Sequence, residues 1–262
     1  GSGDVDDAYD RAVIRAANSD SVASNKQLKR VVRKVDDLDG TRQRRAKQLI
    51  AETDGAGVKL VDELDGDGLQ RVLDLDIDRA DEFRTAAARN LERGNADTDD
   101  IEKFATHADN LEGVDGLNSG PVDDFINSRD PGNVGGALDE VRRADEIGAE
   151  NIERMSIELP DSNEYDGELD IQVESGKIVE SKGSFGYTKG KIDQQFDRKL
   201  RTMKEHEDVA FDGNTLEIRA NRVGDQNLVS SKITEWEQKS KWGSADITIK
   251  VVGEGSGSII TD

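Results

Sequence analysis

The sequence predicts an α+β protein, with a helical N-terminal region followed by an α/β domain. Apolar residues recur at helical spacing up to about residue 128, whereas strand-like alternation begins only near residue 155. Between the helical pattern and the strand-like pattern lies a cluster of residues that break regular structure, Asp-Pro-Gly-Asn, at residues 130–133. We therefore expect a helical region over residues 1–130 and a second domain over residues 131–262.

The composition is typical of a folded protein from a halophile. The 262 residues include 57 acidic and 36 basic side chains, giving a net charge of −21. Self-repulsion of this size opposes a compact state, unless molar salt screens charges beyond about 3 Å. Because apolar residues keep a regular spacing, we expect a folded chain rather than a disordered one. Cysteine is absent, which excludes disulfides and thiolate metal sites, and no apolar run is long enough for a membrane span.

In the first half, short apolar stripes alternate with turns rich in Asp and Gly. The stripes predict helices that include residues 13–17, 28–35, 46–50, 58–61, 83–91 and 101–111. Arg93-Gly94-Asn95 is a typical helix stop, and Asp97 is a typical N-cap for the helix that follows. No clean repeat period is visible in this region.

The second half alternates between helical and strand-like patterns. A helix is expected at residues 134–149, and strands at 155–159, 168–173 and 177–182. The next helix carries Ile192, Phe196, Leu200 and Met203 on one stripe. A strand at 216–220, a helix at 233–241 and a strand at 247–251 complete the order α-β-β-β-α-β-α-β. Residues 254–258 are expected to form a flexible tail, after which Ile259-Ile260 could still dock.

The loop length of the hairpin at residues 168–182 decides where its charged side chains point. A two-residue loop, Ser175-Gly176, would place Asp170 and Glu180 on opposite faces, whereas the three-residue loop 174–176 pairs them directly. Three-residue hairpin loops favour glycine at the third position, which is Gly176, so we expect the three-residue loop. The same solvated face then carries Glu168, Gln172, Ile178 and Lys182.

Two carboxylates paired in this way predict a site for a hard divalent cation. Directly opposed strand residues have Cβ atoms about 4.5–5.5 Å apart, and two acids this close repel each other unless a cation lies between them. Mg²⁺ or Mn²⁺ is expected, held by Asp170, Glu180 and the Ser181 carbonyl. Such an ion activates a bound water and offsets charge on a phosphodiester, while Lys182 orients the water or neutralises the developing charge.

Gly-Glu-Leu-Asp at 167–170, followed by Glu-Ser-Lys at 180–182, resembles the PD-(D/E)xK nuclease superfamily. The resemblance is closest to the nuclease domains of polymorphic toxins and to resolvase-like nucleases, and it covers roughly the second half. It implies a metal-dependent endonuclease that hydrolyses DNA or RNA, with an auxiliary acid on the preceding helix, matched by Glu140. The chain departs from the pattern in lacking Pro before Asp170, and in carrying Lys199 rather than Tyr four positions after Gln195.

Substrate contacts are expected from the helix after the hairpin, as the resemblance implies for Lys191 and Gln195. The segment from 182 to 205 is locally basic in a very acidic chain, which adds Lys189 as a phosphate contact. Gln172, on the same strand face as the two acids, completes the expected set.

The sequence is compatible with several hypotheses about function. As a nuclease, the chain could be the toxic C-terminal region of a larger effector, with an immunity protein or delivery partner, or a DNA repair or restriction enzyme. The start at Gly1-Ser2-Gly3 without Met indicates a fragment. Action in the cytoplasm of a halophile is expected, with secretion or delivery as an alternative. The helical region would bind a partner, serve delivery or position substrate. A non-catalytic interaction module, with Glu180 and Lys182 in a solvated ladder with Glu168, is the alternative from another class.

Overall fold

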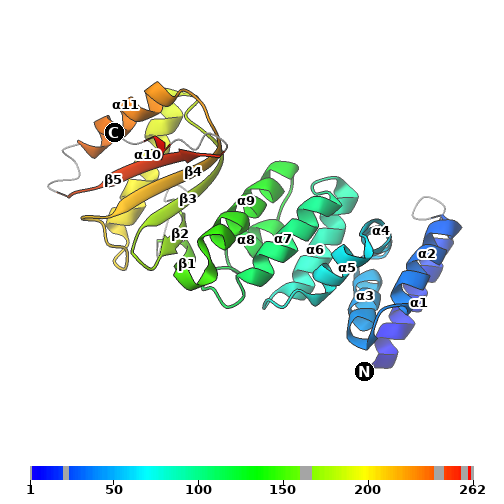
Figure 1. Cartoon of the computed structure of the whole chain (residues 1–262). Coiled ribbons are helices and arrows are strands. Elements are labelled where there is room, and N and C mark those ends of the chain that lie inside the picture. The colour runs from blue at the N-terminus through cyan, green and yellow to red at the C-terminus, as the bar shows by residue number, and fades with distance from the viewer. Residues whose placement is uncertain (1, 20–23, 160–166, 239–244, 255–258, 261–262) are drawn as a thin grey trace. The chain divides into compact units, whose positions relative to one another are not determined.

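The computed structural model describes residues 2–19, 24–159, 167–238, 245–254 and 259–260 (Figure 1). It is a mixed α+β protein, with helices first and a sheet region after them, as the sequence predicts. The chain forms two compact units, an N-terminal unit of residues 1–112 and 122–138 and a C-terminal unit of residues 113–121 and 139–262. The expected boundary at residue 131 coincides with the start of α9 (Pro131–Ile147), whereas the division between the units lies within this helix.

The N-terminal unit is built from short helices that stack in two rows. From α1 to α5, each helix contacts the helix two places further along the chain: α1 contacts α3, α2 contacts α4, and the pattern continues to α5 and α7. This stacking is typical of helical solenoids, in which each layer contacts only its neighbours. The helices are α1 (Ser2–Ala17), α2 (Asn25–Asp36), α3 (Gly40–Thr53), α4 (Gly55–Glu63), α5 (Gly66–Asp74), α6 (Ala80–Arg93), α7 (Thr98–Asn110) and α8 (Pro121–Ile126).

Apolar side chains fill the space between the rows, and basic side chains donate hydrogen bonds to carbonyls at the C-terminal ends of two helices. Phe83, Phe104 and Phe125 form one aromatic cluster, with ring centroids 4.6–5.2 Å apart. At the C-terminal end of α4, Lys34 Nζ donates to the carbonyls of residues 61, 62 and 64. Buried Arg84 does the same for α5, donating to the carbonyls of residues 72, 73 and 75. These cations satisfy carbonyls that have no partner within their own helix.

The C-terminal unit is a mixed sheet with helices on both faces. The strands lie in the order β1-β2-β3-β4-β5-β6; β3, β4 and β5 are parallel neighbours, and the other pairs are antiparallel. Its elements after α9 are a short 3-10 turn (Ala149–Asn151), β1 (Ile152–Ile157), β2 (Leu169–Val173), β3 (Ile178–Phe185), α10 (Lys189–Glu205), β4 (Thr215–Val223), α11 (Gln226–Glu237), β5 (Thr248–Gly253) and β6 (Ile259–Ile260).

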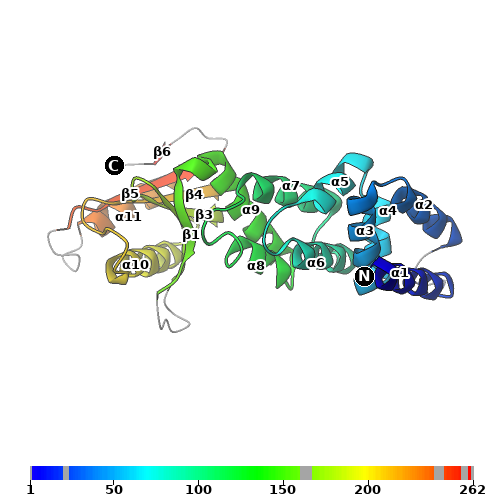
Figure 2. The ribbon, with the colours of Figure 1, turned by 90° about the horizontal axis from the view of Figure 1, so that it is seen from below.

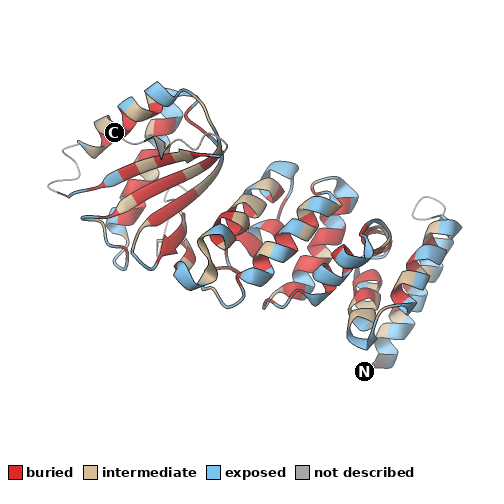
Figure 3. Ribbon diagram, viewed as in Figure 1, coloured by how far each residue is buried: buried red, intermediate tan, exposed pale blue. Residues whose placement is uncertain are grey.

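Helices α10 and α11 cover one face of this sheet (Figure 2). The four predicted stripe residues of α10 are all buried there, together with Ile178, Ile218 and Ala220 of the sheet. Asn221 follows Ala220 and points to the opposite face, where Arg142 and Arg143 of α9 each donate to its Oδ1 at 3.0 Å. Figure 3 shows the resulting pattern, in which the strands are largely buried and the helices are exposed along their outer sides.

The predicted elements are confirmed in order, with shifted ends. The helix expected at 233–241 begins seven residues earlier, at Gln226, and residue 241 lies outside the described residues. Residues 255–258 of the expected tail also lie outside them, whereas Ile259–Ile260 pairs with β5. Among the described residues, we find no helix long and apolar enough to span a bilayer.

Candidate active site

The hairpin of β2 and β3 brings Asp170 and Glu180 together in the register that the sequence predicts. Ile171 pairs with Val179 and Gln172 with Ile178, so the next pair in this register is Asp170 with Glu180. The loop is the three-residue loop 174–176, in which Gly176 has φ +88° and its N–H donates to the Val173 carbonyl at 2.7 Å. The left-handed backbone at this position explains why glycine is needed there.

Each carboxylate is held by the backbone of the other strand. The Asp170 N–H donates to Glu180 Oε1 at 3.1 Å, and the Ser181 N–H donates to Asp170 Oδ2 at 2.7 Å. These two hydrogen bonds fix both side chains toward each other. The expectation of a solvated face is wrong, however, because Glu180 is fully buried and only 14% of the Asp170 side chain is exposed. Helix α10 covers this part of the sheet, which explains the burial.

Two lysines face the paired acids. Lys199 Nζ lies 2.5 Å from Glu180 Oε2 and 3.5 Å from Asp170 Oδ1. Lys182 Nζ lies 3.5 Å from Glu180 Oε2 and 3.8 Å from Asp170 Oδ2. Lys182 comes from β3, two residues after Glu180, whereas Lys199 reaches the pair from α10. With both acids ionised, the formal charges of the four side chains sum to zero.

Lys199 is the site residue that the sequence analysis did not assign. It is buried on α10, and its Nζ also donates to the main-chain carbonyl of Glu168. It lies three residues after Phe196 and four before Met203, so it shares the inward stripe of the helix. A lysine at an apolar position of an amphipathic helix is rarely buried without a charged partner. That anomaly is the sequence signal that could have identified it.

Burial and the neighbouring charges separate the acidities of the two carboxyl groups. Burial, and then the nearby Asp170 carboxylate, raise the pKa of Glu180 to about 7. Burial opposes ionisation of Asp170 as well, but Lys199, Lys182 and the Ser181 N–H together hold its pKa below the usual range. The pKa of Lys199 is raised, because Glu180 and Asp170 outweigh the effect of burial. Of the two acids, Asp170 is therefore the one that stays ionised near neutral pH, and Glu180 is the one that takes up a proton first as the pH falls.

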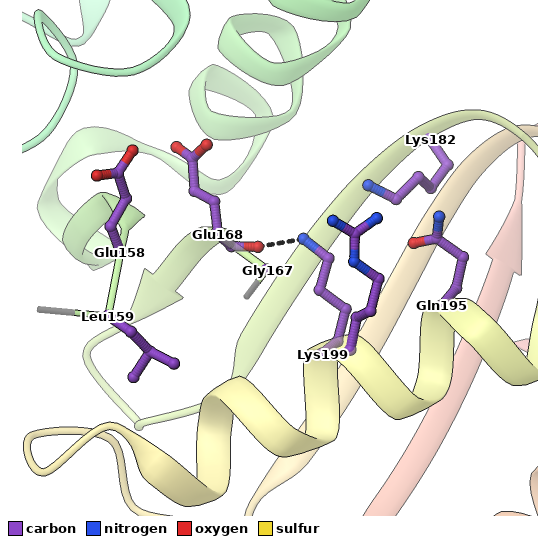
Figure 4. Close-up of a pocket in the computed structure, with 8 residues that line it drawn as sticks. Glu158, Leu159, Gly167, Glu168, Lys182, Gln195 and Lys199 are labelled. Atoms are coloured by element: carbon purple, nitrogen blue, oxygen red, sulfur yellow. Dashed lines mark hydrogen bonds between the residues drawn. The ribbon is translucent and has the colours of Figure 1, made fainter. Parts of the chain in front are cut away.

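A polar cavity of about 370 Å³ adjoins these lysines (Figure 4). Lys182 projects into it from β3, while Gln195 and Lys199 approach from α10. Since Lys182 and Lys199 also contact the carboxylates, they connect the acidic pair with the cavity. The complete lining is Glu158, Leu159, Gly167, Glu168, Lys182, Gln195, Arg198 and Lys199.

The acidic pair has the donor chemistry of a small divalent-cation site. Two ammonium nitrogens lie within 4 Å of both carboxylates, and that of Lys199 is the closer one, so both acids face the same small space. Within the described part of the chain, no cluster of three or more acidic or histidine side chains could hold a metal. Mg²⁺ commonly uses only one or two carboxylates and retains several waters, so Asp170 and Glu180 fit it, provided that the ammonium moves aside.

The other predicted site residues lie at different distances from this centre. Ser181 is adjacent through its N–H, while its buried Oγ has no hydrogen-bond partner among the described atoms. Glu140 is buried on α9, and the side chain of its neighbour Asp139 accepts a hydrogen bond from Asn221 Nδ2 of β4 at 2.8 Å. The role of Glu140 as an auxiliary acid stays a prediction.

The expected substrate contacts divide into two groups. Gln195 lines the cavity, and Lys189 and Lys191 are exposed in the first turn of α10. Gln172 is buried, and its Oε1 accepts a hydrogen bond from Arg154 Nε at 2.8 Å. This placement favours a structural role for Gln172. Arg198, which the sequence analysis did not assign, lines the cavity as well.

Comparison with known proteins adds no relative to this description: no family model, curated protein or solved structure matches the chain.

Proposed function

We propose that this protein is a metal-dependent endonuclease that hydrolyses phosphodiester bonds of DNA or RNA. One observation carries the proposal: the carboxylates of Asp170 and Glu180 face each other at cation-binding distance, beside a cavity lined by Lys182, Lys199, Gln195 and Arg198. Paired acids with perturbed pKa values in a cleft are a recurrent feature of catalytic sites.

Each side chain has a role that follows from its position. Asp170 and Glu180 would hold Mg²⁺ or Mn²⁺, which supplies an activated water and offsets negative charge on the phosphodiester. Lys182 lies within 4 Å of both acids and also lines the cavity, so its ammonium can contact a phosphate oxygen there. Gln195 and Arg198 can hold and orient the rest of the substrate by hydrogen bonds and charge.

Local charge supports an anionic substrate even though the whole chain is acidic. The cavity lining contains three cations, Lys182, Arg198 and Lys199, against two acids, Glu158 and Glu168. In a chain with a net charge of −21, this local excess is unusual and favours binding of a phosphate. At molar salt, release of counterions adds little affinity, so recognition depends on the metal, hydrogen bonds and shape.

The test is cleavage of plasmid DNA and of total RNA with Mg²⁺ or Mn²⁺ in concentrated KCl. We expect cleavage by the native chain, and a loss of about 100-fold or more in Asp170→Asn and Lys182→Met. Glu174→Gln, in the exposed hairpin loop, makes a comparable charge change away from the site and should keep full activity. Intact nucleic acid with every metal would refute the proposal.

A second function is favoured by the ion pairs that both acids already form with lysines. Because Lys182 and Lys199 already balance the two acids, the cluster could be a structural ion network in a non-catalytic interaction module. In that case all variants would leave nucleic acid uncut, and Asp170→Asn would change only stability. As a nuclease, the protein would be either a delivered effector with an immunity protein as its partner, or a repair or restriction enzyme.

A further inference from the structure

The Lys199 ammonium lies against both of the carboxylates that would hold the proposed metal. Its ammonium is the cation closest to the acidic pair, 2.5 Å from Glu180 Oε2, whereas Lys182 stays at least 3.5 Å from both acids. A divalent ion bound by both carboxylates would repel an ammonium group left at this distance. The two cations therefore compete for one place.

The cavity beside Lys199 has room for its ammonium group if a metal displaces it. Lys199 lines the polar cavity, and the Glu168 carbonyl that accepts its hydrogen bond lies on the same cavity wall (Figure 4). The lysine side chain has four rotatable bonds, so the nitrogen can move into the cavity while the α10 backbone stays in place. The helix itself is anchored by buried Ile192, Phe196, Leu200 and Met203.

We infer that Lys199 is a built-in counter-ion that the divalent metal must displace, and that it thereby sets the metal affinity of the site. This inference rests on the proposed function, because it assumes that Asp170 and Glu180 are the metal ligands. It explains how two buried acids are tolerated in the metal-free chain, since an unpaired buried charge would be strongly destabilising. It also assigns to this chain a positioning residue outside the Asp, Glu-x-Lys motif.

The experiment is a titration of the full chain with Mn²⁺, in which electron paramagnetic resonance measures how much Mn²⁺ is bound. We expect weak binding to the native protein, and binding tighter by at least about tenfold in Lys199→Met, which removes the competing charge but keeps the length of the side chain. Lys204→Met, an exposed position on the same helix, is the matched control and should bind as the native chain does. Equal affinity in all three proteins would overturn the inference.

Thermal unfolding gives a second readout that does not depend on activity. Without metal, Lys199→Met should melt below the native chain, and Mn²⁺ should raise its melting temperature more than that of the native chain. If this variant folds only when Mn²⁺ is present, that result supports the inference. Lys199→Gln, which retains a donor for the Glu168 carbonyl, repeats the test with a milder change.

Two outcomes separate the inference from the proposed function. Tighter Mn²⁺ binding in Lys199→Met, together with no cleavage by the native chain, would support the counter-ion and refute the nuclease. Cleavage by the native chain, together with unchanged Mn²⁺ affinity in Lys199→Met, would support the nuclease and refute the counter-ion.

Discussion

Replacing Glu180 with glutamine should remove a pH-dependent cost of folding. In the folded chain, burial and the nearby Asp170 raise the pKa of Glu180 from 4.5 to about 7. One pKa unit corresponds to about 1.4 kcal/mol, so this shift amounts to about 3 kcal/mol. A raised pKa means that the favourable contribution is fully present below pH 4.5 and is lost as the pH rises through 7.

The free energy of unfolding of the native chain should therefore fall by about 3 kcal/mol between pH 4.5 and pH 8 as the coupled Asp170–Glu180 pair titrates. Glutamine keeps the shape and an acceptor for the Asp170 N–H, but it does not titrate. The stability of Glu180→Gln relative to the native chain should rise by that amount over the same range.

Urea unfolding at fixed KCl concentration, with a chelator present, measures this difference. Glu174→Gln, which removes an exposed carboxylate from the same hairpin, is the control for net charge. Its curve should run parallel to that of the native chain. If the curve of Glu180→Gln is parallel as well, the electrostatic account of the buried pair is wrong.

Three further predictions concern the N-terminal unit. Phe104→Ala opens a cavity beside Phe83 and Phe125 and should lower the free energy of unfolding by about 3–5 kcal/mol in urea, whereas Phe104→Leu should cost less. Lys34→Met leaves three carbonyls at the end of α4 without their donor and should cost about 1–3 kcal/mol; unchanged stability would show that water replaces the ammonium. Burial, and then Asp36 and Asp10, raise the pKa of Tyr9 to about 12, so its contribution to stability is present below pH 10 and is lost as the pH rises through 12. Absorbance at about 295 nm should show this late ionisation, and Tyr9→Phe should flatten the loss of stability.

The sequence by itself determined the order of the elements that it predicted, although these did not include α5 and α8, and it determined the register of the β2–β3 hairpin. Both depend on local information: apolar periodicity distinguishes helix from strand, and the glycine third in the loop, Gly176, selects the three-residue turn. Once the turn is set, the alternation of side chains places Asp170 opposite Glu180 without any knowledge of the rest of the fold.

Only the tertiary structure decided what surrounds that pair. Whether Glu180 meets water or a helix depends on how α10 lies across the sheet. This is set by residues far apart in the sequence, such as Phe196 and Ile218, which belong to the same buried core. For the same reason, the sequence shows Lys199 as an unexpected charge on the apolar face of α10 but does not show that it contacts Glu180, nineteen positions earlier. The stacking of the N-terminal helices in two rows was likewise invisible, because contacts between helices two places apart leave no fixed period in a sequence whose helices range from 6 to 17 residues.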